Sequence, residues 1–286
     1  MFTLHNGDCL EVLPSIPSGS IDAIITDLPY GTTACKWDTV IEFAPMWKEV
    51  KRVLKPRGCF VTTSSQPFAS ALVMSNPEMF KYEWIWDKHS KGNFMQANFQ
   101  PLKTHENIMV FSEYPATFAK GKPTAIYYAQ KVAGYIRKAA ETVYPNSWRD
   151  RTKSTYKVGH KGSDSRYPTS IIDISNASHV GKTHPTQKNV SLYEYLIRTY
   201  TNEGETVLDI AMGSGTTIEA AERTGRNSIG IEKDEGIFQS AVLRLKPFTP
   251  SNNRMHLTAF GDESSAVIPL QSNLFAEVPA AKHGGK

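Results

Sequence analysis

The chain has 286 residues, enough for one sizeable hydrophobic core with a small inserted or appended domain. Its 40% hydrophobic and 21% charged residues are typical of a soluble globular protein, no run approaches the ~18 apolar residues of a membrane span, and residues 1–8 do not resemble a signal peptide. Three scattered cysteines exclude a disulfide framework and a Cys-x-x-Cys zinc or redox motif, so we expect a cytoplasmic protein with reduced thiols, and the net charge of +4 leaves a nucleic-acid partner open.

The first 111 residues alternate between predicted strands and helices. A β-branched apolar run at residues 21–26 is typical of a buried parallel strand. Apolar residues at helical spacing predict a helix over residues 44–54, which Pro56 and Gly58 end. Other strands are predicted at residues 2–5, 59–63, 82–86 and 107–111.

Residues 113–170 lack a clear helical or strand period. They carry eleven lysines and arginines against four acids, a local net charge of +7. Seven tyrosines and tryptophans lie among these charges between residues 127 and 167. Lysine and arginine suit phosphate contacts and aromatic rings suit base stacking, so we interpret this segment as an inserted target-recognition region. A solvated basic segment with its own small core is the alternative.

The alternation resumes after the insert. We predict helices at residues 191–200, 216–224 and 235–245, and strands at residues 206–210 and 228–232. Gly225 is placed to end the second helix and Asp234 to cap the third. Beyond Pro247 the periodicity is lost, which indicates a flexible tail. The pattern predicts an α/β fold with a doubly wound, mostly parallel sheet.

A glycine-rich turn follows the predicted strand at residues 206–210. Gly213 and Gly215 would let a ligand approach the backbone, and Thr216 opens the next helix. About twenty residues later, Glu232 ends the next strand at the spacing used to bind ribose hydroxyls. A third glycine at the dinucleotide spacing is missing, which argues against a pyrophosphate. S-adenosylmethionine fits better than a nicotinamide dinucleotide.

The tetrapeptide Asp27-Leu28-Pro29-Tyr30 directly follows the buried strand at residues 21–26. The exocyclic amino nitrogen of a base is a poor nucleophile, because its lone pair is delocalised into the ring. The Asp27 carboxylate and the Leu28 carbonyl can accept its two hydrogens and aim the lone pair at a methyl donor. Pro29 fixes that carbonyl, and Tyr30 can stack on a base flipped from the duplex. A turn with a buried tyrosine is the structural alternative.

With these two motifs and the basic insert between them, the chain resembles the amino-group DNA methyltransferases of prokaryotes and phages, in the motif order of the beta class. The resemblance covers about residues 5–245 and implies a Rossmann-like methyltransferase fold. It implies a catalytic half at residues 1–112, an insert at residues 113–170, a cofactor half at residues 171–247 and a tail at residues 248–286. The implied cofactor is S-adenosyl-L-methionine and the implied partner is double-stranded DNA. The oligomeric state is left open, a homodimer included.

The resemblance also implies roles for individual residues. Asp8 and the backbone amide of Cys9 would hold the cofactor's adenine, Glu232 its ribose and Asp209 its amino group. The segment from His184 to Lys188 would open a helix beside the methionine end. The implied cofactor residues are Asp8, Cys9, Thr186, Lys188, Asp209, Ala211, Gly213, Gly215, Thr216 and Glu232.

Two residues depart from the family pattern. Leu28 replaces a proline, but its role there belongs to the backbone carbonyl. Ala211 replaces an aromatic residue, which predicts a looser cofactor pocket.

Asp27 at the head of the catalytic motif favours adenine N6 as the target, with cytosine N4 as the runner-up. Cytosine C5 chemistry needs a thiolate nucleophile, and no Pro-Cys pair is present. An inactive DNA-binding relative, or a methyltransferase acting on RNA or on protein glutamine, remains an alternative.

Overall fold

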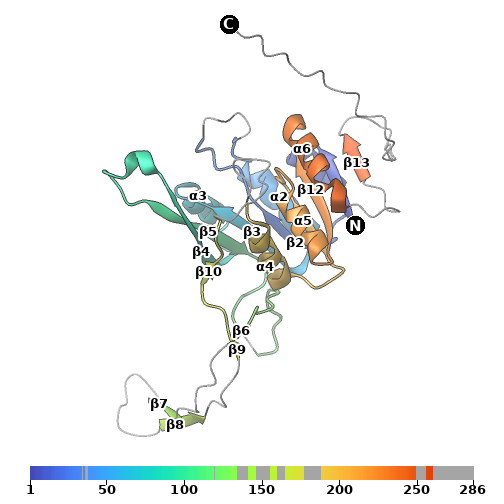
Figure 1. The fold of residues 1–286 in the computed structure, drawn as a ribbon. Helices are drawn as coiled ribbons and strands as arrows, with labels where there is room; N and C mark the ends of the chain where they lie inside the picture. Colours follow the sequence, from blue (N-terminus) through green and yellow to red (C-terminus); the bar gives the residue numbers. More distant parts are fainter. Residues whose placement is uncertain are drawn as a thin grey trace.

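The computed structural model describes residues 1–33, 35, 38–118, 120–133, 165–176 and 188–248, and the backbone of residues 141–145, 155–159 and 256–259. Its centre is a nine-stranded sheet in the order β10-β4-β5-β3-β2-β11-β12-β1-β13 (Figure 1). Within this sheet only β5 runs antiparallel to its neighbours. The predicted doubly wound, mostly parallel sheet is confirmed.

The strands of the sheet are β1 (Phe2–Asn6), β2 (Ile21–Thr26), β3 (Leu54–Ser64), β4 (Phe80–Gly92), β5 (Lys103–Phe111), β10 (Ile171–Asp173), β11 (Thr206–Asp209), β12 (Asn227–Glu232) and β13 (His256–Ala259). The helices are α1 (Cys9–Val12), α2 (Phe43–Val53), α3 (Phe68–Ser75), α4 (Val190–Tyr200), α5 (Thr216–Arg223) and α6 (Glu235–Leu245). Three 3-10 turns are η1 (Leu13–Ser15), η2 (Phe94–Gln96) and η3 (Lys246–Phe248). The insert contributes β6 (Val132–Ala133), which pairs with β9 (Ser165–Arg166), and β7 (Glu141–Pro145), which pairs with β8 (Thr155–Gly159).

Two apolar layers cover the faces of the sheet. Helices α1, α2 and α3 pack on one face through residues such as Trp47 and Leu72, while α4 and α5 pack on the other through residues such as Tyr200 and Ala220. Strand β2 is buried along its whole length, because Ile24 faces the first layer and Ile25 the second. Helix α6 packs beside β1 in a third cluster.

Every strand predicted from the sequence is present, and the three predicted helices after the insert begin within one residue of the prediction. Asp234 caps α6, its side chain accepting a hydrogen bond from Ile237 N at 2.9 Å, and Gly225 follows α5 with φ +73°. The sequence did not predict α3 or β13, and β13 lies after Pro247 where a flexible tail was expected. It adds a strand to the edge of the sheet beside β1.

The order of the strands fixes where a ligand binds. From β2 the chain continues to β3 on one side, whereas β11 and β12 lie on the other side of β2, so the winding direction changes between β2 and β11. In open α/β sheets, ligands bind at the carboxyl ends of the strands at such a switch point. Asp27 and Asp209 mark these ends. No helix within the described residues has the length and apolar content needed to cross a membrane.

Candidate active site

Asp27 lies at the carboxyl end of β2, directly beside the switch point, and one of its two oxygens is held by neighbours. Oδ1 accepts hydrogen bonds from the Tyr30 hydroxyl at 3.0 Å and from the Thr63 hydroxyl near the end of β3. The Lys188 ammonium lies 3.3 Å from the same oxygen. Among the residues that the structure describes, no hydrogen bond to Oδ2 is present. The carboxylate is therefore oriented through Oδ1 and offers Oδ2 to a ligand.

A row of alternating positive and negative side chains connects Asp27 to β4 and β5 through ion pairs. The Lys188 ammonium bonds Glu106 Oε2 at 2.7 Å, and the Lys88 ammonium bonds Glu106 Oε1 at 2.9 Å. Burial opposes ionisation of Glu106, but the two ammonium groups prevail and lower its pKa to about 2. Burial would lower the pKa of Lys188, yet Asp27 and Glu106 raise it above the ordinary value. Two lysines and two carboxylates thus form one network at this edge of the sheet.

Tyr30 is fixed at both its ring and its hydroxyl. Its ring stacks on Phe68 of α3 with centroids 5.2 Å apart and planes 28° from parallel, while its hydroxyl donates to Asp27. Burial raises the pKa of Tyr30 well above its ordinary value, so the hydroxyl stays a donor. Phe68 takes one face of the ring, and the Lys188 ammonium lies over the ring, 5.8 Å from its centroid. Leu28 is 3% exposed and packs into the core, which holds the backbone of the tetrapeptide in place.

Asp209 ends β11 and is 2% exposed. Oδ1 accepts from the Thr26 hydroxyl at 2.7 Å and from Ala211 N at 3.1 Å, and Oδ2 accepts from the Thr217 hydroxyl. Burial raises the pKa of Asp209 to about 6 despite these hydrogen bonds. Its carboxylate therefore ties the glycine turn to the end of β2, one residue before Asp27.

Glu232 and Asp8 lie at the carboxyl ends of the neighbouring strands β12 and β1. Glu232 accepts hydrogen bonds from Gly213 N at 3.0 Å and Asp234 N at 2.8 Å, so it joins the glycine turn to the start of α6. Burial raises the pKa of Glu232. Asp8 accepts from Leu10 N and from the Lys233 ammonium, each at 2.9 Å. Burial opposes ionisation of Asp8, but Lys233 and the amide lower its pKa. Cys9 is buried at the start of α1.

The two glycines of the turn serve different purposes. A Cβ atom on Gly213, whose φ is +53°, would meet no atom within 4 Å. A Cβ atom on Gly215, whose φ is +80°, would lie 2.9 Å from Leu245 Cδ1 on α6. Close packing by α6 thus requires Gly215, whereas the sequence analysis attributed both glycines to ligand approach. The Thr216 hydroxyl also faces the protein, accepting from Arg244 at 3.0 Å.

The hydrogen-bonding groups and the open space in this region fit S-adenosylmethionine. Partly exposed carboxylates of Asp8 and Glu232 can accept from amino and hydroxyl groups, and Gly213 borders open space. The Tyr193 hydroxyl of α4 is buried and has no hydrogen-bond partner among the described residues, although it interacts electrostatically with Asp27 and Asp209. A buried polar atom of this kind favours a ligand partner between the two aspartates. Among the described residues, no group of three His, Cys, Asp or Glu could hold a metal ion.

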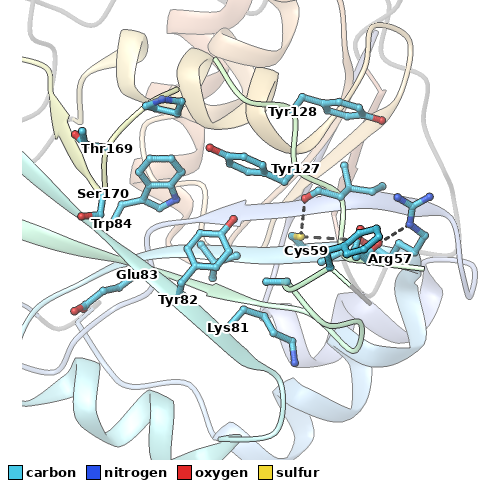
Figure 2. A pocket seen from close by; sticks show the side chains of 17 residues that line it. Arg57, Cys59, Lys81, Tyr82, Glu83, Trp84, Tyr127, Tyr128, Thr169 and Ser170 are labelled. Carbon is cyan, nitrogen blue, oxygen red and sulfur yellow. Dashed lines mark hydrogen bonds between the residues drawn. The ribbon is translucent and has the colours of Figure 1, made fainter. Parts of the chain in front are cut away.

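A pocket of about 570 Å³ lies elsewhere, toward the amino ends of β3 and β4 (Figure 2). The rings of Tyr82, Trp84 and Tyr127 gather around it, with Tyr127 6.3 Å from Trp84 between centroids. None of the residues predicted for the active site lines this pocket. Two residues of the predicted insert line this pocket and bond the main fold. Ile126 N bonds Arg57 O of β3 at 3.0 Å, and Tyr128 N bonds Thr199 O of α4 at 2.8 Å. These residues of the insert therefore pack against the sheet and α4.

The structure brings most predicted site residues to one edge of the sheet. Lys188, which was grouped with the cofactor residues, lies just before the Asn189 cap of α4, and its ammonium contacts Asp27 and Glu106; its predicted cofactor role stays a prediction. Thr186 lies outside the described residues. Sequence reasoning missed Thr63, Lys88, Glu106 and Tyr193. Thr63 could have been found, since it ends the predicted strand next to β2, whereas Glu106 depends on an antiparallel pairing that no local pattern reveals.

Comparisons with known proteins agree with this fold. The family model described as DNA methylase, for N6 and N4 methyltransferases, matches residues 21–243. The type II methyltransferase M.HpaI of Haemophilus parainfluenzae is 26% identical over 253 residues, which cover 83% of this chain and 72% of that protein. The structure of the M1.HpyAVI–SAM complex shares the fold with a TM-score of 0.55 and 22% identity, covering 86% of this chain and 100% of that one. The cytosine-N4-specific PvuII DNA methyltransferase gives a TM-score of 0.59 and 21% identity, covering 88% of this chain and 87% of that one.

Proposed function

The chain belongs to the DNA methylase family of N6 and N4 methyltransferases, and within that family we propose that it transfers the methyl group of S-adenosylmethionine to N6 of adenine in double-stranded DNA. The observation that carries the proposal is the arrangement of Asp27. Its Oδ1 is held by three neighbours at the switch point of the sheet, while Oδ2 is left for a substrate. A carboxylate positioned in this way is suited to orienting an amino group.

The reaction depends on two acceptors from the tetrapeptide. Asp27 Oδ2 and the Leu28 carbonyl accept the two amino hydrogens, which localises the nitrogen lone pair and directs it at the methyl group. When bound, S-adenosylmethionine would supply that methyl group from a sulfonium centre, whose S–C bond breaks as the N–C bond forms and leaves a neutral thioether. The nitrogen gains positive charge as the new N–C bond forms, and the Asp27 carboxylate stabilises that charge. The excess proton then leaves the nitrogen through Asp27 Oδ2.

The target adenine must leave the duplex to reach Asp27, since its amino group is otherwise paired within the helix. We propose that the Tyr30 ring, which Phe68 holds on one face, stacks on the flipped base beside the Lys188 ammonium, which lies over the ring 5.8 Å from its centroid. Stacking on an aromatic ring is worth about 1–3 kcal/mol per base. The rigid support of Tyr30 reduces the entropy that the ring loses on stacking.

For the cofactor, we propose that Glu232 accepts from the ribose hydroxyls and that Asp8 with the Cys9 amide holds the adenine. Gly213 gives the ligand close access to the turn. Asp209 is 2% exposed and both of its oxygens bond within the protein, whereas Asp8 and Glu232 are partly exposed, so we propose that Asp209 acts through the turn it holds. The SAM complex of M1.HpyAVI, which has the same fold, supports this choice of cofactor.

Adenine is proposed over cytosine because an aspartate heads the catalytic motif. The similar fold of the cytosine-N4-specific PvuII enzyme makes cytosine N4 the second candidate. We further propose that the basic segment at residues 113–170 contributes to DNA binding. Its net charge of +7 contrasts with −3 for the rest of the chain.

The test is methyl transfer from labelled S-adenosylmethionine to unmethylated plasmid DNA by wild type, Asp27→Ala and Asp27→Asn. We expect Asp27→Ala to lose at least ~10³-fold in rate with nearly unchanged cofactor affinity, because the carboxylate orients the base and not the cofactor. Asp27→Asn keeps an acceptor oxygen and should retain more activity than Asp27→Ala. Transfer by Asp27→Ala at the wild-type rate would show that the catalytic assignment is wrong.

A further inference from the structure

The hairpin of β4 and β5 extends past the edge of the sheet on the side of the active site (Figure 1). The pairing of β5 with β3 ends at Asn107, yet β5 continues to Lys103, a further four residues or roughly 13 Å. The pairing of β10 with β4 likewise ends at Asp87. Beyond these points, within the described residues, β4 and β5 form strand pairs only with each other, although Asn176 N bonds Lys88 O at 2.8 Å and His89 contacts Asp173 at the base. The hairpin therefore ends in a two-stranded ribbon, whose loop at residues 93–101 we name the tip.

The base of this ribbon belongs to the active site. Lys88 on β4 and Glu106 on β5 form the charge network that reaches Asp27 through Lys188. A duplex that presents a flipped base to Asp27 must therefore pass close to the ribbon. The ribbon suits a polyanion, because residues 88–106 contain three lysines and one acid, Glu106, which lies at the base and bonds Lys88.

The tip has an unusual composition for a surface loop. All of its residues are exposed, including Phe94 at 66%, Met95 at 95% and Phe99 at 88%. Clustered exposed apolar side chains of this size indicate a binding surface. Its other side chains include four amides, Asn93, Gln96, Asn98 and Gln100. Amides pair with the N6 and N7 edge of adenine in the major groove, and apolar side chains contact the thymine methyl group there.

From these features we propose that the tip enters the major groove beside the target base and reads base edges there, as a recognition element separate from the basic insert. The major groove, about 12 Å wide, admits a two-stranded ribbon. The inference rests on the proposed function, because that function places DNA at Asp27. It adds a specificity role to residues 93–101, which lie within the predicted catalytic half.

Contact is tested by crosslinking in the full-length protein. Phe99 is replaced by p-benzoylphenylalanine, and the protein is irradiated with labelled fragments of unmethylated plasmid DNA. We expect a light-dependent adduct with DNA, and none when Leu243, an exposed residue on α6, is replaced in the same way. An adduct between two protein chains would identify a second copy as the occupant of the tip and overturn the proposal, as would the absence of any adduct.

Reading of base edges is tested with fragments in which 7-deazaadenine replaces adenine and removes the N7 acceptor. Wild type should bind them about tenfold more weakly than normal fragments. The triple variant Gln96→Ala, Asn98→Ala, Gln100→Ala should bind both equally weakly. Met95→Ala should also weaken DNA binding, while Met74→Ala, which alters an exposed methionine on α3, should not. Wild-type affinity and discrimination in the triple variant would refute the proposal.

Neither experiment requires methyl transfer. If the tip binds DNA but no methyl group is transferred, the proposed function fails and the recognition role stands. If the enzyme methylates DNA and the tip variants bind like wild type, only the recognition role fails.

Discussion

At the residue scale, the account depends on the difference between the two oxygens of Asp27. The sequence predicted that Asp27 ends a buried strand, because a β-branched run stops directly before it. It could not predict that Tyr30, Thr63 and Lys188 all converge on Oδ1, since Thr63 and Lys188 reach it only through long-range packing. Local patterns place a residue on an element, but only the assembled sheet selects its partners.

Glu106 provides a test of the charge network through pH. The pKa of its carboxyl falls from an ordinary 4.5 to about 2 on folding, so its stabilisation is complete above pH 4.5 and is lost as the pH falls toward 2. Glu106→Gln leaves Lys88 without its carboxylate partner and removes one from Lys188, and it should lower the free energy of unfolding by ~3 kcal/mol at neutral pH. Urea unfolding across pH should show that the difference in free energy of unfolding between wild type and Glu106→Gln becomes smaller below pH 4.5.

Glu83→Gln, at an exposed site on β4, is the control and should change the free energy of unfolding by less than ~0.5 kcal/mol. If the difference in free energy of unfolding between wild type and Glu106→Gln does not change with pH, the ion pairs of Glu106 do not stabilise the fold as described.

At the element scale, the glycine turn between β11 and α5 is joined to the end of β2 through Asp209 and to the end of β12 through Glu232. Its position was predictable from the strand, the two glycines and the following helix. The structural requirement for glycine at residue 215 was not predictable, because the side chain that limits the space there, Leu245 of α6, lies thirty residues later in the chain. The sequence did not predict helix α3 for a related reason: its run of small and apolar residues has no helical period, and the helix is defined by packing against α2.

The sequence also did not predict the ribbon of β4 and β5, because its residues do not alternate between apolar and polar side chains as a strand does.

Substitutions at the two glycines should separate packing from ligand access. Gly215→Ala should lower stability by about 2 kcal/mol, because the new methyl group meets Leu245 in a left-handed backbone. Gly213→Ala meets no atom, and should cost only about 1 kcal/mol of strain while weakening S-adenosylmethionine binding. Urea unfolding and calorimetric titration of the cofactor measure the two effects. The Gly215→Ala loss should shrink in a Leu245→Ala background, and equal losses in both backgrounds would contradict the packing explanation.

At the scale of the whole molecule, charge is divided unevenly along the chain. The segment at residues 113–170 carries +7 and the remainder −3, so DNA contacts should be concentrated in that segment and on the ribbon. The sequence identified this segment from its composition alone. It did not predict that Ile126 and Tyr128 bond Arg57 on β3 and Thr199 on α4, because these two residues lie outside any regular element that a local pattern could reveal.

Salt dependence tests this distribution. If about six phosphates are neutralised, the affinity for unmethylated plasmid fragments should fall by roughly 10³ between 50 and 200 mM salt. Fluorescence anisotropy at a series of salt concentrations gives the slope directly. A nearly salt-independent affinity would exclude phosphate contacts as the main source of binding.

The central claim is tested most directly by the chemical identity of the product. The protein is incubated with labelled S-adenosylmethionine and unmethylated double-stranded DNA, and the DNA is digested to nucleosides and separated. The account predicts that the label is found in N6-methyldeoxyadenosine. Label in N4-methyldeoxycytidine would contradict the choice of base, and label found only in RNA or protein would contradict the proposed function itself.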